Sequence, residues 1–373
     1  MLVLMTTDAV GGVWNYCARL AEALGDHQVQ VALATMGPAP SDSQRDQVRR
    51  LADVQLHEST FKLEWMQDPW DDVARAGEWL LSLEHRLRPD VIHLNGYVHA
   101  ALPWSNPVLV VAHSCVCSWF EAVRKREPTH EWDEYRRRVA RGLRCADLVT
   151  APTQAALRVL GRHYGPFRSA GPIHNGCTPI KRVEGEAEPL VLSVGRLWDP
   201  AKGVAVLDLA AKDIRWPVLA AGATNGPDGQ SIELKNIRGL GTLDQRTLHE
   251  WYQRASIFAS PAVYEPFGLA ALEAGLAGCA LVLSDIPSLR EVWSDAAVFV
   301  PPEDHRTLAR EVNRLIDDVS LRQEYSARAC RAARTYTLGR MADGYHQIYR
   351  DLLRREESSS LEVAGHPSPV GSL

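Results

Sequence analysis

Short apolar runs alternate with helix-spaced apolar stripes along most of the chain. The runs are rich in Val, Ile and Leu and are bounded by Gly, Pro and Asp, which is typical of buried strands. The expected strands lie at residues 2–6, 30–35, 54–57, 90–94, 107–112 and 148–151, and then at 190–194, 218–222, 237–240, 257–260, 280–284 and 297–300. Strands that alternate with helices predict β/α units and parallel sheets.

The strands fall into two series separated by a polar stretch, KRVEGEAEP. We therefore expect an N-terminal domain at 1–180, a linker at 181–189 and a second domain at 190–337. A final helix at 338–355 carries an apolar stripe, and such a stripe needs a surface to cover. The last residues, 356–373, have the composition of a disordered tail.

Composition supports this division and excludes several classes of protein. A chain of 373 residues is comfortable for two domains, and 46% hydrophobic and 23% charged residues indicate a globular protein. The net charge of −5 gives no reason to expect nucleic acid as a partner. The seven cysteines lack CxxC spacing, so neither a disulfide framework nor a structural zinc site is indicated. The cysteine usage favours a reduced protein. Because the apolar start MLVLM is too short for a signal peptide and no run reaches membrane-span length, we expect a cytoplasmic protein.

The segment PAVYEPFGLAALEAGLAGCALVLSD, residues 261–285, carries two carboxylates on a predicted strand–turn–helix–strand unit. We expect the helix to begin at Pro266 and to end at Gly275 and Gly278. Glu265 precedes the helix and Glu273 lies inside it, about 12 Å further along a helical axis. That separation is too large for an acid/base dyad or a shared metal clamp, so both side chains suit sugar or ribose hydroxyls. The alternative is one more crossover of a parallel sheet, although a carboxylate on an apolar helix is costly without partners.

A second group of candidates lies on loops that follow strands. Arg196 and Lys202 lie in the loop after residues 190–194, where a guanidinium and an ammonium suit two phosphates, or are simply surface charges on a turn. Gly11 and Gly12 lie between the first strand and a helix, where backbone N–H groups can approach an anion, or where a tight turn requires glycine. His113 follows another strand, and such a histidine is usually a hydrogen-bonded structural residue.

Asn95, Gly96 and Tyr97 follow the strand at 90–94, so they lie at the carboxyl edge of the expected sheet. Ligands of open parallel sheets bind at that edge. The region 124–144 is locally basic, and interleaved glutamates favour a solvated, ion-paired face over a patch for an anionic acceptor or a membrane surface.

The E-x7-E spacing with Pro-Phe-Gly, together with the upstream Arg/Lys loop, resembles the nucleotide-sugar site of retaining glycosyltransferases of family 4. The resemblance covers nearly the whole chain. It implies an α/β protein of the GT-B fold, in which two Rossmann-like parallel-sheet domains face a central cleft and a C-terminal helix crosses back. Two features depart from the family pattern. His113 is followed by Ser114 where Asp is common, and the interval from Arg196 to Lys202 is one residue longer than usual.

The resemblance implies a role for each candidate residue. Arg196, Lys202 and the glycine pair would hold the donor diphosphate, Glu273 the ribose, and Glu265 and His113 the transferred sugar. The implied catalytic residues are His113, Arg196, Lys202 and Glu265. The implied donor-binding residues are Gly11, Gly12, Arg196, Lys202, Gly239, Glu265, Phe267, Gly268, Leu269 and Glu273. Asn95 and Tyr97 would lie on the acceptor side.

These roles predict a metal-independent hexosyltransferase that uses a nucleotide-diphosphate sugar as co-substrate and no cofactor. No D-x-D pair stands at a strand end in a loop suited to Mg²⁺. The acceptor is a hydroxyl of a glycan, glycolipid or small molecule, and polysaccharide biosynthesis is a common role in the family. Membrane contact would be at most peripheral, through residues 124–144.

Three alternatives remain open from the sequence. One is a nucleotide-sugar epimerase of the same fold, another is a phosphorylase-like enzyme, and the last is a partner subunit that binds nucleotide weakly. The nucleotide base, the sugar, the acceptor, the linkage, the pathway and the oligomeric state are set by contacts that spacing does not show.

Overall fold

The computed structural model describes residues 1–178, 187–226 and 229–364, with side chains described as far as Glu356. The first seven strands form one parallel sheet in the order β3-β2-β1-β4-β5-β6-β7. These strands are β1 Leu2–Asp8, β2 Gln30–Met36, β3 Val54–Glu58, β4 Val91–Leu94, β5 Val108–Val111, β6 Leu148–Ala151 and β7 Ala170–Pro172. Its longer helices are α1 Gly12–Gly25, α2 Asp42–Arg49, α3 Trp70–Leu87, α5 Asp133–Cys145 and α6 Gln154–Tyr164.

A second parallel sheet has the order β10-β9-β8-β11-β12-β13. Its strands are β8 Glu188–Val194, β9 Val218–Ala221, β10 Arg238–Gly241, β11 Ala255–Ser260, β12 Ala280–Ser284 and β13 Val298–Val300. Its helices are α7 Val204–Ala210, α8 Gln245–Arg254, α9 Leu269–Ala277, α10 Pro287–Trp293, α11 His305–Asp317 and α12 Val319–Ala333. Each sheet has one apolar cluster on either face. The expected fold class, two Rossmann-like parallel-sheet domains, is therefore confirmed.

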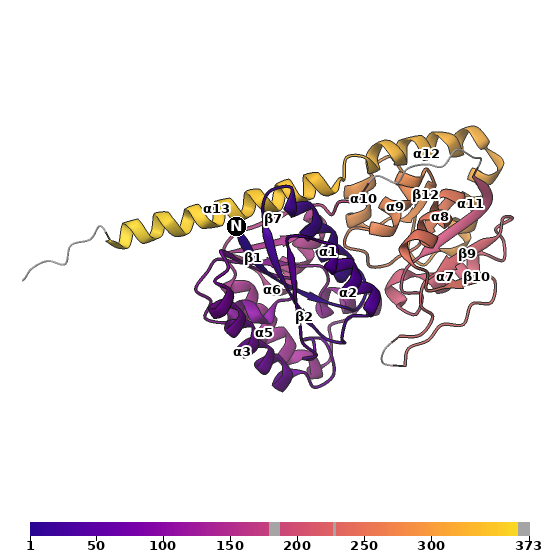
Figure 1. The fold of residues 1–373 in the computed structure, drawn as a ribbon. Helices are drawn as coiled ribbons and strands as arrows, with labels where there is room; N and C mark the ends of the chain where they lie inside the picture. Colours follow the sequence, from indigo (N-terminus) through magenta and orange to yellow (C-terminus); the bar gives the residue numbers. More distant parts are fainter. Residues whose placement is uncertain (179–186, 227–228, 365–373) are drawn as a thin grey trace, which may run out of the picture.

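The last helix, α13 Leu338–Ala364, leaves the second domain and runs along the first, as Figure 1 shows in yellow. Its stripe is buried in the first domain's core, which confirms the predicted crossing. The fully buried residues of the stripe are Met341, Tyr345, Tyr349 and Leu352. The helix continues past Arg355 into the stretch expected to be a tail, and residues 365–373 lie outside the described part. Among the described residues, no helix is both long and apolar enough to cross a membrane.

The two chain crossings between the domains lie against each other. Cys177, on the way into the second domain, forms a bridge with Thr337, on the way back. A Cβ atom on Gly176 would lie 2.2 Å from the Thr337 carbonyl oxygen, so only glycine fits there. Most of the expected linker, residues 181–186, lies outside the described residues. Strand β8 begins at Glu188, within the last part of that linker.

Two predicted helices differ from the observed ones. Helix α9 begins at Leu269, not at Pro266, because the Glu265 carboxylate accepts a hydrogen bond from the Gly268 N–H and holds the preceding residues in a turn. Gly275 lies inside this helix, where a Cβ atom would come within 3.0 Å of the Trp293 ring, and Gly278 alone forms the left-handed C-cap.

The helical stretch expected at 119–147 is also broken. It consists of the short α4 Val116–Trp119, a π-helical turn Phe120–Arg124, and then α5. Lys125 adopts a left-handed conformation with φ 54°, and Pro128 follows, so neither residue continues a helix.

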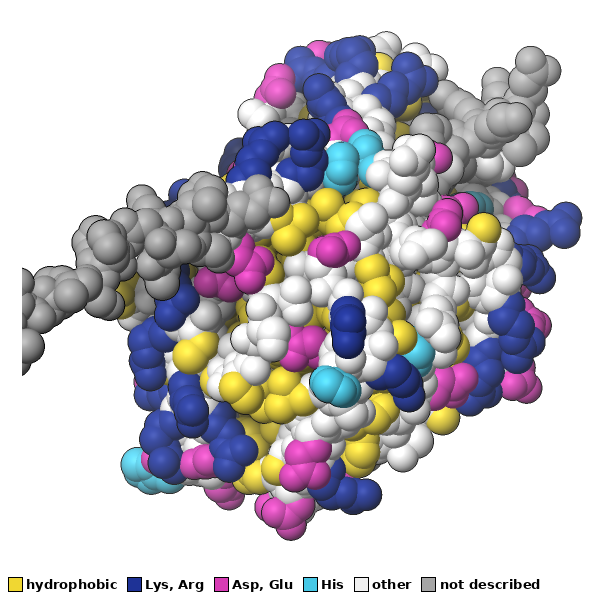
Figure 2. Space-filling model, turned by 60° about the vertical axis from the view of Figure 1, so that its left-hand side comes forward, with side chains coloured by type: hydrophobic (Ala, Val, Ile, Leu, Met, Phe, Trp, Pro, Cys, Tyr) yellow, Lys and Arg dark blue, Asp and Glu magenta, His cyan; other side chains and the backbone are white. Residues whose placement is uncertain are grey.

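Some of the basic side chains of this region are ion-paired with the interleaved glutamates. Glu127 pairs with Arg136, and Glu134 pairs with Arg137 and Arg138. On the face of the molecule in Figure 2, dark blue Lys and Arg side chains lie next to magenta Asp and Glu side chains. Exposed pairs of this kind contribute little to stability and give a solvated surface.

In each sheet, the strand order places the candidate loops beside the point where that order reverses. In the first sheet the order reverses between β1 and β4, and in the second between β8 and β11. Crevices form at the carboxyl ends of strands at such switch points. The domains are held together beside this crevice by Glu291 of α10, whose carboxylate accepts from the backbone N–H groups of Gln154 and Ala155 at 2.7 and 2.8 Å.

Candidate functional site

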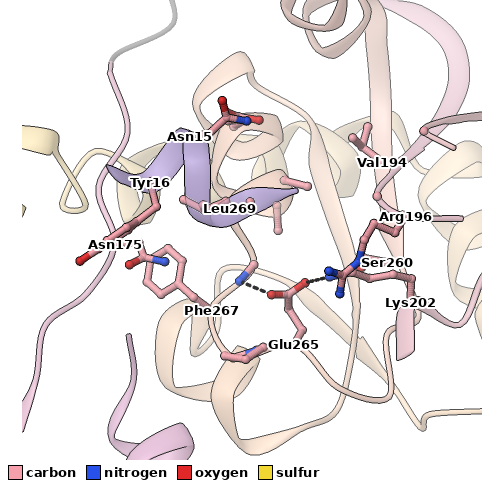
Figure 3. Close-up of a pocket in the computed structure, with 18 of the residues that line it drawn as sticks. Asn15, Tyr16, Asn175, Val194, Arg196, Lys202, Ser260, Glu265, Phe267 and Leu269 are labelled. Carbon is pink, nitrogen blue, oxygen red and sulfur yellow. Dashed lines mark hydrogen bonds and ion pairs between the residues drawn. The ribbon is translucent and has the colours of Figure 1, made fainter. Parts of the chain in front are cut away.

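A cavity of about 430 Å³ lies between the two domains and is lined by residues from both. Gly12, His113, Arg196, Lys202, Glu265 and Glu273, separated widely in the sequence, all line it. Figure 3 shows part of the lining, with Arg196, Lys202 and Glu265 on one side and Asn15, Tyr16 and Asn175 on the other. A concave, largely preformed site between domains is where small molecules usually bind.

The N-terminus of α1 points its first residues at this cavity. Gly11 caps the helix with φ 87°, a conformation that favours glycine, and a Cβ atom there would lie 3.8 Å from Nη1 of Arg196. Gly12, Asn15, Tyr16 and Arg19 follow at helical spacing and all line the cavity. The partial positive charge of a helix N-terminus therefore adds to the Arg196 guanidinium.

His113 reaches the cavity from the end of β5 and is held from two sides. Its Nε2 lies 2.7 Å from Oδ1 of Asn95, and the Tyr16 ring packs edge-on at 4.4 Å. Burial lowers the pKa of His113 to about 4, so the imidazole is neutral near pH 7. Nδ2 of Asn95 donates to the Thr6 carbonyl oxygen, which leaves Oδ1 as an acceptor. Nε2 of His113 consequently carries the proton, and Nδ1 is free to accept.

Asp199 orients Arg196. Its buried carboxylate accepts from Nη2 of Arg196 at 2.7 Å and from the Ala201 N–H at 3.0 Å. It also accepts from the Trp119 indole of the other domain at 3.2 Å. These bonds fix the longer loop between Arg196 and Lys202 and tie it to the N-terminal domain.

Lys202 and Glu265 form an ion pair inside the cavity, drawn in Figure 3. Nζ of Lys202 lies 2.7 Å from Oε2 of Glu265, whose Oε1 accepts from the Gly268 N–H at 3.0 Å. Burial opposes ionisation of Glu265, but the Lys202 ammonium and the N–H groups of Phe267 and Gly268 outweigh it and lower the pKa of the carboxyl. The Glu265 carboxyl is therefore ionised at neutral pH.

Glu273 projects from α9 and meets Arg19 of the other domain. Oε1 of Glu273 lies 2.8 Å from Nη2 of Arg19, and both side chains are largely buried. Nη1 of Arg19 also lies 3.6 Å from the Cys177 sulfur. The carboxylate that the family resemblance assigns to ribose thus has a cationic partner across the cleft.

The other expected donor-side residues are distributed around this centre. Phe267, Gly268 and Leu269 line the cavity. Gly239 lies within β10 and is not among the residues that line the cavity. From this part of the chain the lining residues are Thr242 and Leu243, just beyond the strand. The expected acceptor-side residues, Asn95 and Tyr97, line a second cavity of about 370 Å³ that adjoins the first. Throughout the described part of the chain, no three His, Cys, Asp or Glu side chains converge as a metal site.

Sequence reasoning missed Arg19, Asp199, Tyr16 and Asp8. The spacing of Gly12, Asn15, Tyr16 and Arg19 along one face of α1 is a signal that could have indicated two of them. The remaining two are ordinary acidic residues near strand ends, and only the packed structure distinguishes them.

Two family models match consecutive parts of the chain. The model for Glycosyltransferase Family 4 matches residues 10–179, and the model for Glycosyl transferases group 1 matches residues 179–331. The chain is 26% identical to the glycogen synthase of Mycobacterium tuberculosis over 407 aligned residues, which cover 96% of each protein. It is 32% identical to the phosphatidyl-myo-inositol mannosyltransferase of Mycolicibacterium smegmatis over 157 residues, 39% of this chain and 41% of that protein. This second match spans less than half of the relative's length.

Solved structures share the arrangement over almost the whole chain. The sucrose-phosphate synthase of Thermosynechococcus elongatus superposes with a TM-score of 0.78 at 19% identity, covering 95% of this chain and all of that one. Anabaena HepE, solved in complex with UDP and glucose, superposes with a TM-score of 0.73 at 15% identity, covering 94% of this chain and 100% of that one. At these identities the likeness concerns the fold.

Proposed function

We propose that this chain, a glycosyltransferase of the GT-B fold, transfers a sugar from a nucleotide-diphosphate sugar to a hydroxyl acceptor with retention of the anomeric configuration and without a metal ion. The observation that carries the proposal is the cavity between the domains. It gathers three cationic side chains, a helix N-terminus and two carboxylates from three separate segments of the chain. This set matches the chemistry of a diphosphate joined to a polyhydroxylated sugar and ribose.

The cationic part of the cavity would stabilise the leaving group. As the bond between the anomeric carbon and the phosphate oxygen breaks, negative charge grows on the β-phosphate. Arg196, Lys202 and the N-terminus of α1 are preorganised donors for that charge. Asp199 keeps Arg196 in place, while Lys202 would share its ammonium between Glu265 and the phosphate.

Hydroxyl groups would be held by the remaining side chains. Glu265 accepts from the donor sugar, and His113 accepts through Nδ1 from the opposite domain. Glu273 would bind the ribose after its ion pair with Arg19 has partly opened. These interactions concern groups that bear no changing charge, so they serve mainly to position the donor.

Retention is supported by the position of the second cavity, which the expected acceptor-side residues line. The two cavities share His113 and Arg196, so an acceptor would approach from the side on which the phosphate leaves. The acceptor oxygen forms its bond to the anomeric carbon on that face. Its proton passes to an oxygen of the departing phosphate, so no protein base is required.

Steady-state kinetics on single variants tests these roles. Arg196→Ala and Lys202→Ala should each lower kcat by about 100-fold, because one donor to the developing charge is lost. Glu273→Gln should chiefly raise the KM of the donor, since ribose binding is common to the ground and transition states. Glu265→Gln should affect both parameters.

Lys212→Ala removes an exposed lysine of the same domain and is the matched control. The donor is chosen first by a thermal-shift screen of UDP, GDP, ADP and dTDP, because a ligand of the folded state raises the unfolding midpoint. The assignment is wrong if Lys202→Ala changes only KM while Glu273→Gln abolishes kcat.

A further inference from the structure

The second cavity is a candidate for the acceptor, and its walls carry information about acceptor chemistry. It has a volume of about 370 Å³ and lies mainly in the N-terminal domain. It shares Val10, Val13, His113, Ser114 and Arg196 with the donor cavity. A molecule bound there would therefore lie beside the transferred sugar.

One wall is a run of aromatic rings that support one another. Trp119 packs edge-on to Phe120 with ring centroids 5.4 Å apart, Phe120 lies 6.2 Å from Trp132, and Trp132 packs edge-on to Tyr135 at 5.6 Å. All four line the cavity. Flat apolar faces held in this way suit the C–H face of a pyranose ring, as they suit other ring-shaped ligands.

The polar groups at the end nearer the donor are mostly acceptors. Asp8, the last residue of β1, uses Oδ1 to accept from the Val10 N–H at 2.8 Å, and no hydrogen bond to its Oδ2 is found among the described residues. Glu64 lies deeper, where its carboxylate accepts from the N–H groups of Tyr97 and Val98. A hydroxyl group of a ligand could donate to Asp8.

The two cationic side chains that line this cavity, Lys62 and Arg196, already have partners in the protein. Nζ of Lys62 donates to the carbonyl oxygens of Gln67 and Asp68 at 3.0 and 3.5 Å. Arg196 is paired with Asp199 and also lines the donor cavity. His113 is neutral near pH 7. A phosphate group entering here would meet the Asp8 carboxylate, while Lys62 is held by two backbone carbonyl oxygens and Arg196 is shared with the donor cavity.

We propose that this cavity binds a neutral sugar residue as the acceptor, with its ring face against the Trp119–Phe120–Trp132 wall and a hydroxyl donating to Asp8, and that it disfavours phosphorylated sugars. The proposal rests on the glycosyl transfer proposed above. It goes further by assigning the chemical class of the acceptor.

The test compares matched neutral and phosphorylated acceptors with the donor that the nucleotide screen identifies. Maltose and glucose are paired with glucose 6-phosphate and glucose 1-phosphate, and product formation is followed by mass spectrometry. We expect kcat/KM to be at least about tenfold higher for the neutral sugars, as one unfavourable charge contact would give. Trp132→Ala, which leaves the bond from Trp119 to Asp199 in place, should raise the KM of the neutral acceptors.

The sign of the effect of Asp8→Asn provides an independent test. Asn at this position accepts a hydroxyl less strongly than a carboxylate, so the KM of a neutral acceptor should rise. For an anionic acceptor the same change removes repulsion, and the KM should fall. Asp46→Asn, an exposed aspartate of α2, is the matched control.

A preference for phosphorylated sugars, a preference for an apolar alcohol such as farnesol, or a lowered KM for maltose in Asp8→Asn would each overturn the acceptor proposal while leaving glycosyl transfer intact. If no nucleotide raises the unfolding midpoint and no sugar is transferred from any donor, the proposed function itself fails, and the acceptor proposal fails with it.

Discussion

Asp8 should make the free protein less stable at neutral pH, and replacing it with Asn should relieve this. Burial raises the pKa of Asp8 from its ordinary value of 3.8 to about 6, although the Val10 N–H and the Arg196 charge act in the opposite direction. A carboxyl whose pKa is higher in the folded state than in the unfolded state contributes stability at low pH. That contribution is lost as the pH rises through about 6.

The size of the effect follows from the two pKa values. One pKa unit of difference corresponds to about 1.4 kcal/mol, so full loss above pH 6 has a ceiling of about 3 kcal/mol. Asp8 keeps some contact with solvent, which screens its charge, so we expect about 1 kcal/mol. Asp8→Asn preserves an oxygen that can accept from the Val10 N–H and lacks the ionisation. The variant should therefore be more stable than the parent at pH 8, with the difference shrinking at pH 5.

Urea and thermal unfolding of both proteins at the two pH values measure this difference. A gain of 1 kcal/mol in a domain of this size corresponds to roughly 2–4 °C in Tm. Asp46→Asn, which replaces an exposed aspartate of α2, is the matched control for the substitution itself. Equal or lower stability of Asp8→Asn at pH 8, or a difference that does not change with pH, would refute the reasoning. A stabilised variant would also show that its acceptor kinetics are measured on folded protein.

Three further predictions concern other parts of the molecule. Transfer should persist in EDTA, because we propose that the cations and N–H groups of the cleft, not a metal ion, stabilise the leaving group. Activity lost in EDTA but restored by Mg²⁺ or Mn²⁺ would contradict this. Truncation at Thr337 should lower Tm and activity together by removing the buried stripe of α13, whereas truncation at Glu356 should do little; calorimetry of both proteins decides. Glu291→Ala should lower the free energy of unfolding by about 1 kcal/mol, because it removes the acceptor for two N–H groups at the start of α6. The control Glu250→Ala removes an exposed pair with Arg246 and should leave Tm nearly unchanged.

The repeating pattern of apolar runs sufficed to predict both sheets. Parallel strands are buried on both faces, so their sequences are nearly continuous apolar runs. The short edge strand β7 was not predicted, because Ala170–Pro172 lacks an apolar run. The start of α9 was misplaced for a local reason. The Glu265 side chain satisfies the Gly268 N–H and competes with helix formation, which propensity alone does not reveal.

The candidate site was predictable wherever a loop motif carries its own chemistry, as with Arg196, Lys202 and Glu265. It was not predictable where two domains supply the partners. The contact of Arg19 with Glu273 joins residues 254 positions apart, and its existence depends on how the domains dock. The aromatic wall of the acceptor cavity belongs to a segment whose helix is broken, so its periodicity gives no indication of which rings face inward.

The return of α13 to the first domain has a consequence for how the protein is made. The face that Met341, Tyr345 and Tyr349 cover belongs to a domain whose last strand ends at Pro172. At a synthesis rate of about 5–20 residues per second, the ribosome needs on the order of 10–30 s to deliver the missing helix. During that time the nascent first domain carries an uncovered apolar face, and it completes its core only when the end of the chain emerges. The first domain therefore completes its core only after the second domain has been translated.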